Sequence, residues 1–191
     1  MSDVVSSYRL PEVPARVPHV PLSHPLPALA VLLSLSLLEV HPAVGQGLPA
    51  WVTVDSAART VHLALDVTAT AGEPSARIAG VRDGGAQVVV PLGWTVTWDW
   101  RNADSAAPHS LVVMQEREKL PTEGGRPPFT NAMTKSLTAG LAAGQSDHTS
   151  FEADQTGWYW LLCGVPSHAL QGEWLGLKVD ADAKTAGVAL K

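Results

Sequence analysis

The sequence contains a single cysteine, Cys163, in 191 residues. One cysteine cannot form a disulfide within the chain, so the usual reason for keeping cysteine in an exported protein does not apply. A buried thiol that packs as a small apolar side chain is the simplest alternative use of the residue. A functional role is favoured instead, because the turn residues Gly164 and Pro166 and the imidazole of His168 follow closely.

Basic residues, phenylalanine and tyrosine are also scarce. The chain has 13 Lys and Arg against 18 Asp and Glu, a formal net charge of -5, and no basic cluster interleaved with aromatic residues. These features exclude nucleic acid as an expected partner. Phe and Tyr number two each, whereas seven Trp and many Val, Thr, Gly and Pro are present, which favours short strands joined by turns. We predict an all-β fold in one domain.

No apolar run near the N-terminus is long enough to span a bilayer comfortably. The stretch 26–38 has 13 residues, follows the proline-rich residues 1–25 and precedes small residues at 43–45. We interpret residues 1–45 as a disordered leader with a signal peptide, or as a membrane anchor through 26–38, and residues 46–191 as the folded domain. The protein is therefore expected to be exported to the periplasm or the extracellular face of the membrane.

Alternating apolar and polar residues from about residue 51 onward indicate strands with one buried face. In residues 61–67 this alternation places His62 on the wetter face, and in 95–100 it places three large apolar side chains on one side. The expected arrangement is a β-sandwich or Greek-key barrel. Further strands are predicted at 87–92, 109–115, 148–152, 157–163 and 174–180.

A long segment, residues 116–147, is rich in Gly, Pro, Thr and Ala. Compact domains seldom contain such a segment unless it carries function or its own short helix. We predict a short helix over 130–143.

Metal-binding side chains lie within and upstream of the cysteine segment. A thiolate and an imidazole in the pattern Cys163-x4-His168 are donors suited to copper. A second histidine, His109, stands at the entry of a predicted strand 54 residues upstream of the cysteine. The other histidines of the predicted domain, His62 and His148, are interpreted as surface residues.

Three segments resemble a cupredoxin, and most closely a sulfocyanin: APHSLVV at 107–113, WYWLLCGVPSH at 158–168 and GEW at 172–174. The likeness covers roughly residues 50–181. It implies a cupredoxin Greek-key β-sandwich in which His109, Cys163 and His168 are the three equatorial ligands of one copper ion per chain. By the same resemblance the protein is an electron carrier.

The fourth ligand position departs from that family pattern. Sulfocyanins and their relatives have a methionine five residues after the second histidine, and this chain has Glu173 there. Glu173 is in phase with Leu175 and Leu177, which predicts an inward carboxylate that binds copper. In the alternative arrangement the carboxylate turns to solvent and leaves a three-ligand or water-capped site. Two substitutes, Met114 and Met133, are more simply explained by packing.

A carboxylate ligand predicts a lower reduction potential and a green or red rather than blue colour. Here the site resembles nitrosocyanin, a red cupredoxin relative whose copper also carries a Glu oxygen. For an electron carrier, a protein redox partner is expected to dock near His168, where Val165, Pro166 and Leu170 form an apolar patch. A monomer is expected.

Three other functions use the same residues. An oxygen-rich copper site with an open position would bind or convert a small molecule such as nitric oxide, and the segment 116–147 would wall its pocket. The four side chains also suit tetrahedral zinc. A nucleophilic pair of Cys163 and His168 lacks the Gly-rich oxyanion element that such catalysis requires.

Overall fold

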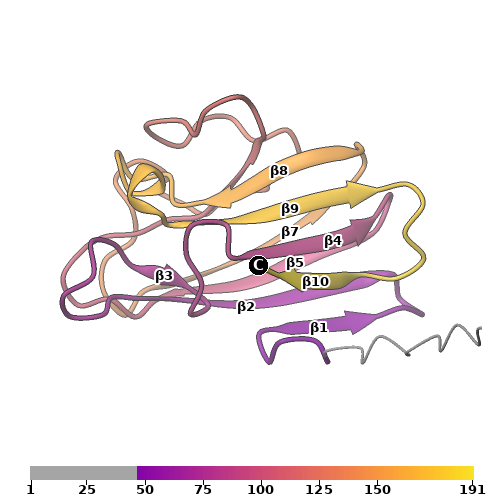
Figure 1. Ribbon diagram of the computed structural model, residues 1–191, viewed down its shortest axis with the longest axis horizontal. Coiled ribbons are helices and arrows are strands. Elements are labelled where there is room, and N and C mark those ends of the chain that lie inside the picture. Colours follow the sequence, from indigo (N-terminus) through magenta and orange to yellow (C-terminus); the bar gives the residue numbers. More distant parts are fainter. Residues whose placement is uncertain (1–46) are drawn as a thin grey trace, which may run out of the picture. The chain divides into compact units, whose positions relative to one another are not determined.

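The structure is a computed structural model that describes residues 47–191, so the predicted leader and anchor lie outside the described residues. In this part of the chain ten strands form two five-stranded sheets (Figure 1). Among the described residues, no helix has the length and apolar character needed to cross a membrane.

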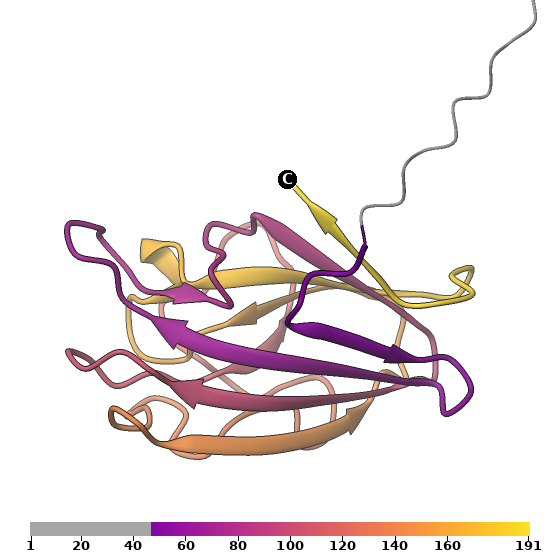
Figure 2. The same ribbon diagram turned by 90° about the horizontal axis from the view of Figure 1, so that it is seen from below.

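The first sheet has the strand order β1-β2-β5-β7, and β3 pairs with β2 outside this path. Figure 2 shows β2, β5 and β7 side by side, with β1 at the edge. The strands β2 and β5 are parallel, whereas β5 and β7 are antiparallel. The bounds are β1 (Val52–Asp55), β2 (Thr60–Thr68), β3 (Arg77–Ile78), β5 (Thr95–Asn102) and β7 (Ser146–Glu152).

The second sheet has the strand order β10-β4-β9-β8-β6. Its central pairs are β4 with β9, which are parallel, and β9 with β8, which are antiparallel. A short 3-10 helix, η1 (Ala169–Gln171), lies between β8 and β9 in the chain. The bounds are β4 (Ala86–Pro91), β6 (Val112–Gln115), β8 (Gly157–Leu162), β9 (Trp174–Asp180) and β10 (Gly187–Leu190).

The core lies between the two sheets and follows the predicted alternation. Val61 and Leu63 of β2 are fully buried, as are Trp98 of β5 and Leu177 of β9. All four belong to one hydrophobic cluster. The polar alternates stay wetter, and His62 is half-buried. The predicted all-β sandwich is confirmed.

The predicted helix over 130–143 is wrong. It has no run of helical hydrogen bonds, and two of its backbone N–H groups donate to a distant segment of the same chain: Thr134 to the carbonyl of Leu111, and Leu141 to that of His109. The backbone also has positive φ at Asn131, Ser136 and Gly140, which is incompatible with a regular helix. The segment is an irregular strip that bonds to residues 109–113.

The predicted strand 109–115 is shorter than expected, since β6 begins at Val112. His109 and Leu141 instead form an isolated bridge. The prediction failed at this end because the partner of residues 109–111 is the irregular strip, which forms an isolated bridge with His109 and no regular ladder. His109 is thereby held just ahead of the sheet.

Candidate metal centre

Four side chains gather at one end of the sandwich, where η1 lies beside the end of β8 and the start of β9 (Figure 1). One ligand atom from each of His109, Cys163, His168 and Glu173 lies within 4.8 Å of all the others. The structure therefore brings together the four residues singled out in the sequence. The exposed fraction is 0% for Cys163, 1% for Glu173 and 2% for His109, and the His168 side chain is 20% exposed.

The segment 163–173 supplies three of the four side chains and is closed by its own backbone. Cys163 follows β8 directly, and Glu173 precedes β9. The N–H of Cys163 donates to the carbonyl of Glu173 at 3.1 Å, and the N–H of Glu173 donates to the carbonyl of His168 at 3.2 Å. Because β8 and β9 pair in antiparallel register, the two ends of this loop lie side by side. The spacing of its three donors is consequently fixed by the sheet.

Gly172 makes the turn that ends η1 and aims Glu173 inward. Its φ is 106°, in the region that favours glycine. A Cβ atom at this position would lie 2.3 Å from Oδ1 of Asp83. A side chain at Gly172 would therefore be strained and would have to displace the Asp83 side chain, so the turn before Glu173 favours glycine.

A buried carboxylate holds the ring of His109. Oδ2 of Asp104 lies 2.9 Å from Nε2 of His109, and the two side chains are 6% and 2% exposed. Asp104 is itself fixed, because its Oδ1 accepts from the N–H of Ala106 at 2.7 Å. The Nε2–H of His109 donates a hydrogen bond to Asp104. The lone pair of Nδ1 therefore points towards the other possible metal-ligand atoms. The sequence analysis missed Asp104; its position five residues before the histidine in a turn is only a weak signal.

The thiol of Cys163 receives a hydrogen bond from the backbone. The N–H of Ser110 lies 3.4 Å from the Cys163 Sγ. The Ser110 hydroxyl donates to the carbonyl of Leu137 at 2.6 Å and accepts from the N–H of Gly164 at 2.9 Å. Ser110 therefore ties three segments together, namely the approach to β6, the long segment 116–147 and the cysteine loop. Its role was also not foreseen.

The distances between donor atoms match those around a single transition-metal ion. The Nδ1 atoms of His109 and His168 are 3.2 Å apart, and the Cys163 Sγ lies 3.9 Å and 3.6 Å from them. Two nitrogens about 2.0 Å and a sulfur about 2.3 Å from one ion would be separated by roughly 3.3 to 3.6 Å at tetrahedral angles. The Sγ–Nδ1 distance to His109 exceeds this range slightly, so these three side chains fit a metal with a small adjustment.

Glu173 contacts both histidines without completing its hydrogen bonds. Its Oε1 lies 2.8 Å from Nδ1 of His109, and its Oε2 lies 3.2 Å from Nδ1 of His168. Oε1 is nevertheless buried without a hydrogen-bond partner. The short distance to His109 thus lacks hydrogen-bond geometry, as expected when donor atoms face a common centre. A buried carboxylate oxygen left in this way is costly unless a cation compensates it.

The electrostatics of the four side chains are tightly linked. Burial raises the pKa of the Cys163 thiol, and the nearby Glu173 carboxylate raises it further. Burial acts to raise the pKa of Glu173 as well, but the contacts with His109 and His168 outweigh it and the pKa is lowered. For His109 burial acts to lower the pKa, yet Glu173 and Asp104 raise it overall. A divalent cation would compete with protons for the Cys163 thiol and for Nδ1 of His109.

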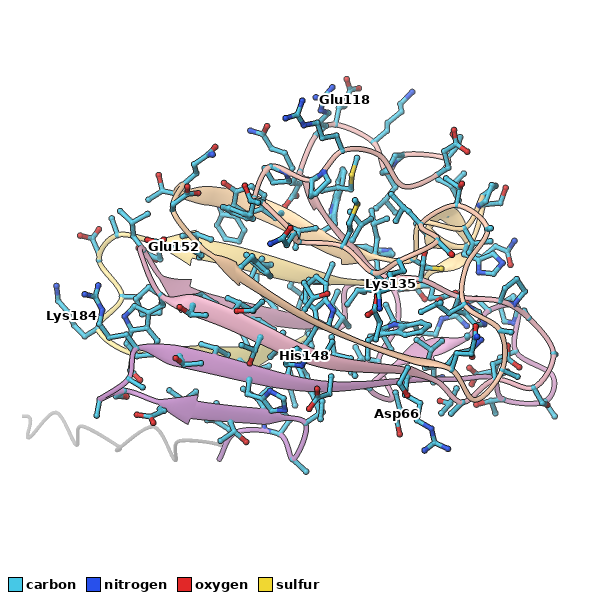
Figure 3. All side chains as sticks on the ribbon, turned by 180° about the vertical axis from the view of Figure 1, so that it is seen from behind. Asp66, Glu118, Lys135, His148, Glu152 and Lys184 are labelled. Atoms are coloured by element: carbon cyan, nitrogen blue, oxygen red, sulfur yellow. The ribbon has the colours of Figure 1, made fainter. Side chains whose placement is uncertain are left out.

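Other residues considered in the sequence lie elsewhere. His62 and His148 both contact Asp99 on the outer face of the first sheet, where Figure 3 labels His148. Met114 packs against the small hydrophobic cluster of Val112, Trp160, Leu162 and Ala169. Met133 is 42% exposed. As predicted, the two histidines are surface residues.

Comparison with known proteins supplies the class. The model of the Sulfocyanin (SoxE) domain matches residues 49–187. The chain is thus a cupredoxin. It belongs to the sulfocyanin family.

One curated relative and two solved structures illustrate the likeness. Sulfocyanin of Sulfolobus acidocaldarius is 27% identical over 126 residues, which are 62% of this chain and 63% of that protein, so the chain spans less than two thirds of its relative's length. Rusticyanin from Thiobacillus ferrooxidans is 20% identical with a TM-score of 0.46, over 68% of this chain and 88% of that one. Auracyanin from Roseiflexus castenholzii is 22% identical with a TM-score of 0.42, over 61% and 96%.

Proposed function

We propose that this protein is an electron-transfer protein that holds one copper ion with His109, Cys163, His168 and Glu173. The observation that carries the proposal is the buried convergence of these four donors. It is supported by membership of the sulfocyanin family and by the likeness to rusticyanin, whose structure is described as that of a copper protein. One thiolate and two imidazoles are donors that suit both oxidation states of copper.

The surrounding structure favours electron transfer, because it keeps the donors in one arrangement. His109 is fixed by Asp104 and by its bridge to Leu141, and the cysteine loop is fixed by the pairing of β8 with β9. When bound, copper supplies the one-electron redox change. A rigid set of donors lowers the reorganisation that accompanies this change. The protein itself therefore positions the ligand side chains, excludes water from them and supplies the negative charge of Glu173.

Glu173 in place of a thioether makes this site atypical. An anionic oxygen donor stabilises Cu(II) over Cu(I), so the reduction potential should lie below that of a site with methionine. It should also weaken the interaction between copper and the thiolate that makes ordinary sites blue. A green or red colour is expected.

The test compares the copper-loaded wild type with Glu173→Met and Glu173→Gln. We expect Glu173→Met to shift the visible spectrum towards blue and to raise the potential by at least about 59 mV, a tenfold change in the relative affinity for the two oxidation states. Glu173→Gln keeps the size and an oxygen donor but removes the charge, so its potential should lie between the other two. Identical spectra and potentials would exclude Glu173 as a ligand. Stoichiometric zinc without copper, after expression with both ions, would overturn the copper assignment.

We place the docking surface for a protein redox partner around His168. Leu170 is 53% exposed and Pro166 is exposed beside the histidine, whose side chain is one fifth exposed. Apolar contacts beside one partly exposed ligand would bring a partner close to the metal. The chain is further proposed to be exported, on the strength of the apolar stretch 26–38.

A second candidate function is the binding or conversion of a small molecule such as nitric oxide at the metal. One observation favours it: a cavity of about 190 Å³ is lined by His109, His168 and Glu173. Stopped-flow mixing of the copper protein with nitric oxide tests this function. A new spectral species supports it, whereas an unchanged spectrum supports a pure electron carrier.

A further inference from the structure

A short turn between β3 and β4 holds the backbone on both sides of Glu173. This turn connects the first sheet to the second, because β3 belongs to one and β4 to the other. The N–H of Asp83 donates to the carbonyl of Gly172 at 2.7 Å, and the N–H of Gly84 donates to the carbonyl of Trp174 at 3.0 Å. The carbonyls that precede and follow the glutamate are therefore both bound by one turn from a distant part of the chain.

The guanidinium of Arg82 adds a third bond, at the end of η1. Its Nη2 donates to the carbonyl of Gln171 at 3.0 Å, and its Nε donates to Oδ2 of Asp83 at 2.7 Å. Another carboxylate oxygen, Oε2 of Glu73, lies 3.9 Å from Nη1. Only 20% of the Arg82 side chain is exposed. One planar group with several donors thus joins the turn 82–84 to the loop before β9.

Two glycines allow the turn and the loop to approach this closely. A Cβ atom at Gly172 would lie 3.0 Å from Nη2 of Arg82. Gly84, with φ of 64°, would place a Cβ atom 2.2 Å from the ring of Trp174. Because neither residue carries a side chain, the backbones meet directly. The position of the backbone beside Glu173 is therefore tied to the position of the turn.

The cysteine end of the same loop is held by a different segment. The N–H of Gly124 donates to the carbonyl of Gly164 at 2.9 Å, and the N–H of Ser167 donates to the carbonyl of Thr122 at 2.7 Å. Both contacts come from the long segment between β6 and β7. Loosening the turn between β3 and β4 should consequently displace the glutamate more than the cysteine.

We propose that Arg82 is a positioning residue for the metal centre: it fixes the turn 82–84 against residues 171–174 and thereby sets how closely the Glu173 carboxylate approaches the metal. The inference rests on the proposed copper site. Arg82 acts through the backbone, since its contact with the loop is a carbonyl and not a metal-ligand atom. A carboxylate that withdraws from copper stabilises Cu(II) less, so the reduction potential rises.

The test compares the copper-loaded wild type with Arg82→Lys, which keeps the positive charge but lacks the fork that reaches two acceptors at once. We expect one copper per chain, a visible spectrum shifted towards that of Glu173→Met, and a higher reduction potential. The rise should correspond to a loss of about threefold in the affinity for Cu(II) relative to Cu(I), smaller than the change of about tenfold expected for Glu173→Met. Arg82→Ala should shift both values further. A spectrum and potential unchanged in Arg82→Lys would overturn the positioning role.

Arg77→Lys is the matched control. Arg77 also pairs with Glu73, at 2.6 Å, but its other hydrogen bond is to the carbonyl of Gly80 and not to the loop before β9. This variant should retain the wild-type spectrum and potential. Equal shifts in Arg77→Lys and Arg82→Lys would contradict a specific role of Arg82.

A second pair of variants tests whether Arg82 acts through Glu173. Glu173→Ala removes the carboxylate and keeps the thiolate and both histidines. Adding Arg82→Lys to this variant should leave the potential unchanged, because the carboxylate that Arg82 positions is absent. An equal rise with and without the glutamate would show that Arg82 affects the metal by another route and would overturn the proposal.

A measurement on the metal-free protein examines the contact itself. Amide hydrogen exchange at Asp83 and Gly84 should be about tenfold faster in Arg82→Lys than in the wild type, since their N–H groups bond to the loop that Arg82 holds. Exchange at Gly124, which bonds to the cysteine end of the loop, should not change. Unchanged exchange at Asp83 and Gly84 would show that the turn is held without Arg82.

The outcomes distinguish this inference from the proposed function. A wild type that binds no copper would overturn the proposed function, and the role of Arg82 at a copper centre with it. Copper binding with the expected spectrum in the wild type, together with the same spectrum and potential in Arg82→Lys, would overturn only the role of Arg82 and leave the electron carrier intact.

Discussion

Two clusters of histidine and carboxylate within residues 47–191 differ in their surroundings: one lies on the outer face of the first sheet and one is buried at the end of the sandwich, beside β8 and β9. In the outer cluster, Asp99 of β5 lies 3.3 Å from Nε2 of His62 and 2.8 Å from Nδ1 of His148. In the inner cluster, Glu173 lies 2.8 Å and 3.2 Å from the Nδ1 atoms of two histidines. The distances are nearly the same. The outer side chains, however, are 37% to 65% exposed.

The difference shows that environment, and not the set of side chains, makes a metal centre. Water solvates the outer charges, and exposed ion pairs contribute little to stability. The inner carboxylate is almost fully buried beside a thiol, and one of its oxygens has no hydrogen-bond partner. Buried charges require compensation. Equivalent substitutions in the two clusters should therefore have unequal effects.

The largest effect is expected from Cys163→Ser, because only the inner cluster contains a thiolate. The variant should lose the intense visible absorption completely, since a hydroxyl is a poor copper donor at neutral pH. His148→Ala, in the outer cluster, should retain the wild-type spectrum and copper content. Absorption spectra and metal analysis of the two variants measure the visible band and the copper content. A visible band that survives in Cys163→Ser would contradict the assignment of the thiolate.

The next effect concerns the stability of the protein freed of metal by chelation. Glu173→Gln removes the buried charge that faces His109 and His168, although His109 keeps Asp104, and should lower the free energy of unfolding by about 3 kcal/mol, as for other broken buried pairs. Asp99→Asn should change it far less. Urea unfolding followed by tryptophan fluorescence measures both. Equal losses in the two variants would remove the distinction between the clusters.

The pH dependence of the same measurement follows from the two pKa shifts. The raised pKa of His109 contributes stability in full below its ordinary value of 6.5, and this is lost as pH rises through the raised value. The lowered pKa of Glu173 contributes above its ordinary value of 4.5, and this is lost as pH falls through the lowered value. Both contributions are complete between about pH 4.5 and 6.5. The free energy of unfolding should therefore be largest in this pH range. Glu173→Gln should flatten this maximum, whereas Asp99→Asn should preserve it.

A smaller effect is expected for Asp104→Asn, which alters the support of His109 without removing a donor. Loss of such a carboxylate behind a metal-bound histidine costs roughly 10- to 100-fold in metal affinity. Asp99→Asn is again the control, and its copper affinity should equal that of the wild type. Competition with a copper chelator gives both constants. An unchanged affinity in Asp104→Asn would show that the hydrogen bond to His109 does not position the ring for copper.

The smallest effect is expected at the surface beside His168. Leu170→Ser removes an exposed apolar side chain from the proposed docking surface and should slow electron transfer to a protein partner severalfold. The spectrum and potential should not change, because the side chain is not a donor. Stopped-flow oxidation by a small inorganic oxidant should be unaffected, and this separates docking from redox chemistry. An equal slowing with the inorganic oxidant would point to a change at the metal centre.

Local patterns in the sequence were sufficient to predict the strands that pair with their neighbours in a regular ladder and bury one face. The alternation in 61–67 and 95–100 predicts β2 and β5, because one face of each must enter the core. Parity with Leu175 and Leu177 likewise predicts an inward Glu173, since the residue continues the phase of β9. Cys163, His168 and Glu173 lie within eleven residues of one another, so one loop presents all three.

Other features were decided by contacts between distant segments. The segment 116–147 has the composition of a loop with a helix, yet its N–H groups bond to the approach to β6. The roles of Asp104 and Ser110 depend on which atoms they face, and a sequence pattern does not encode this. The segment between β2 and β3 lines the cavity beside the four side chains only because β2, β3 and the loop before β9 meet at one end of the sandwich. The single cysteine thus identified the chemistry, and the tertiary structure determined its surroundings, because burial and charge compensation arise only when remote segments pack together.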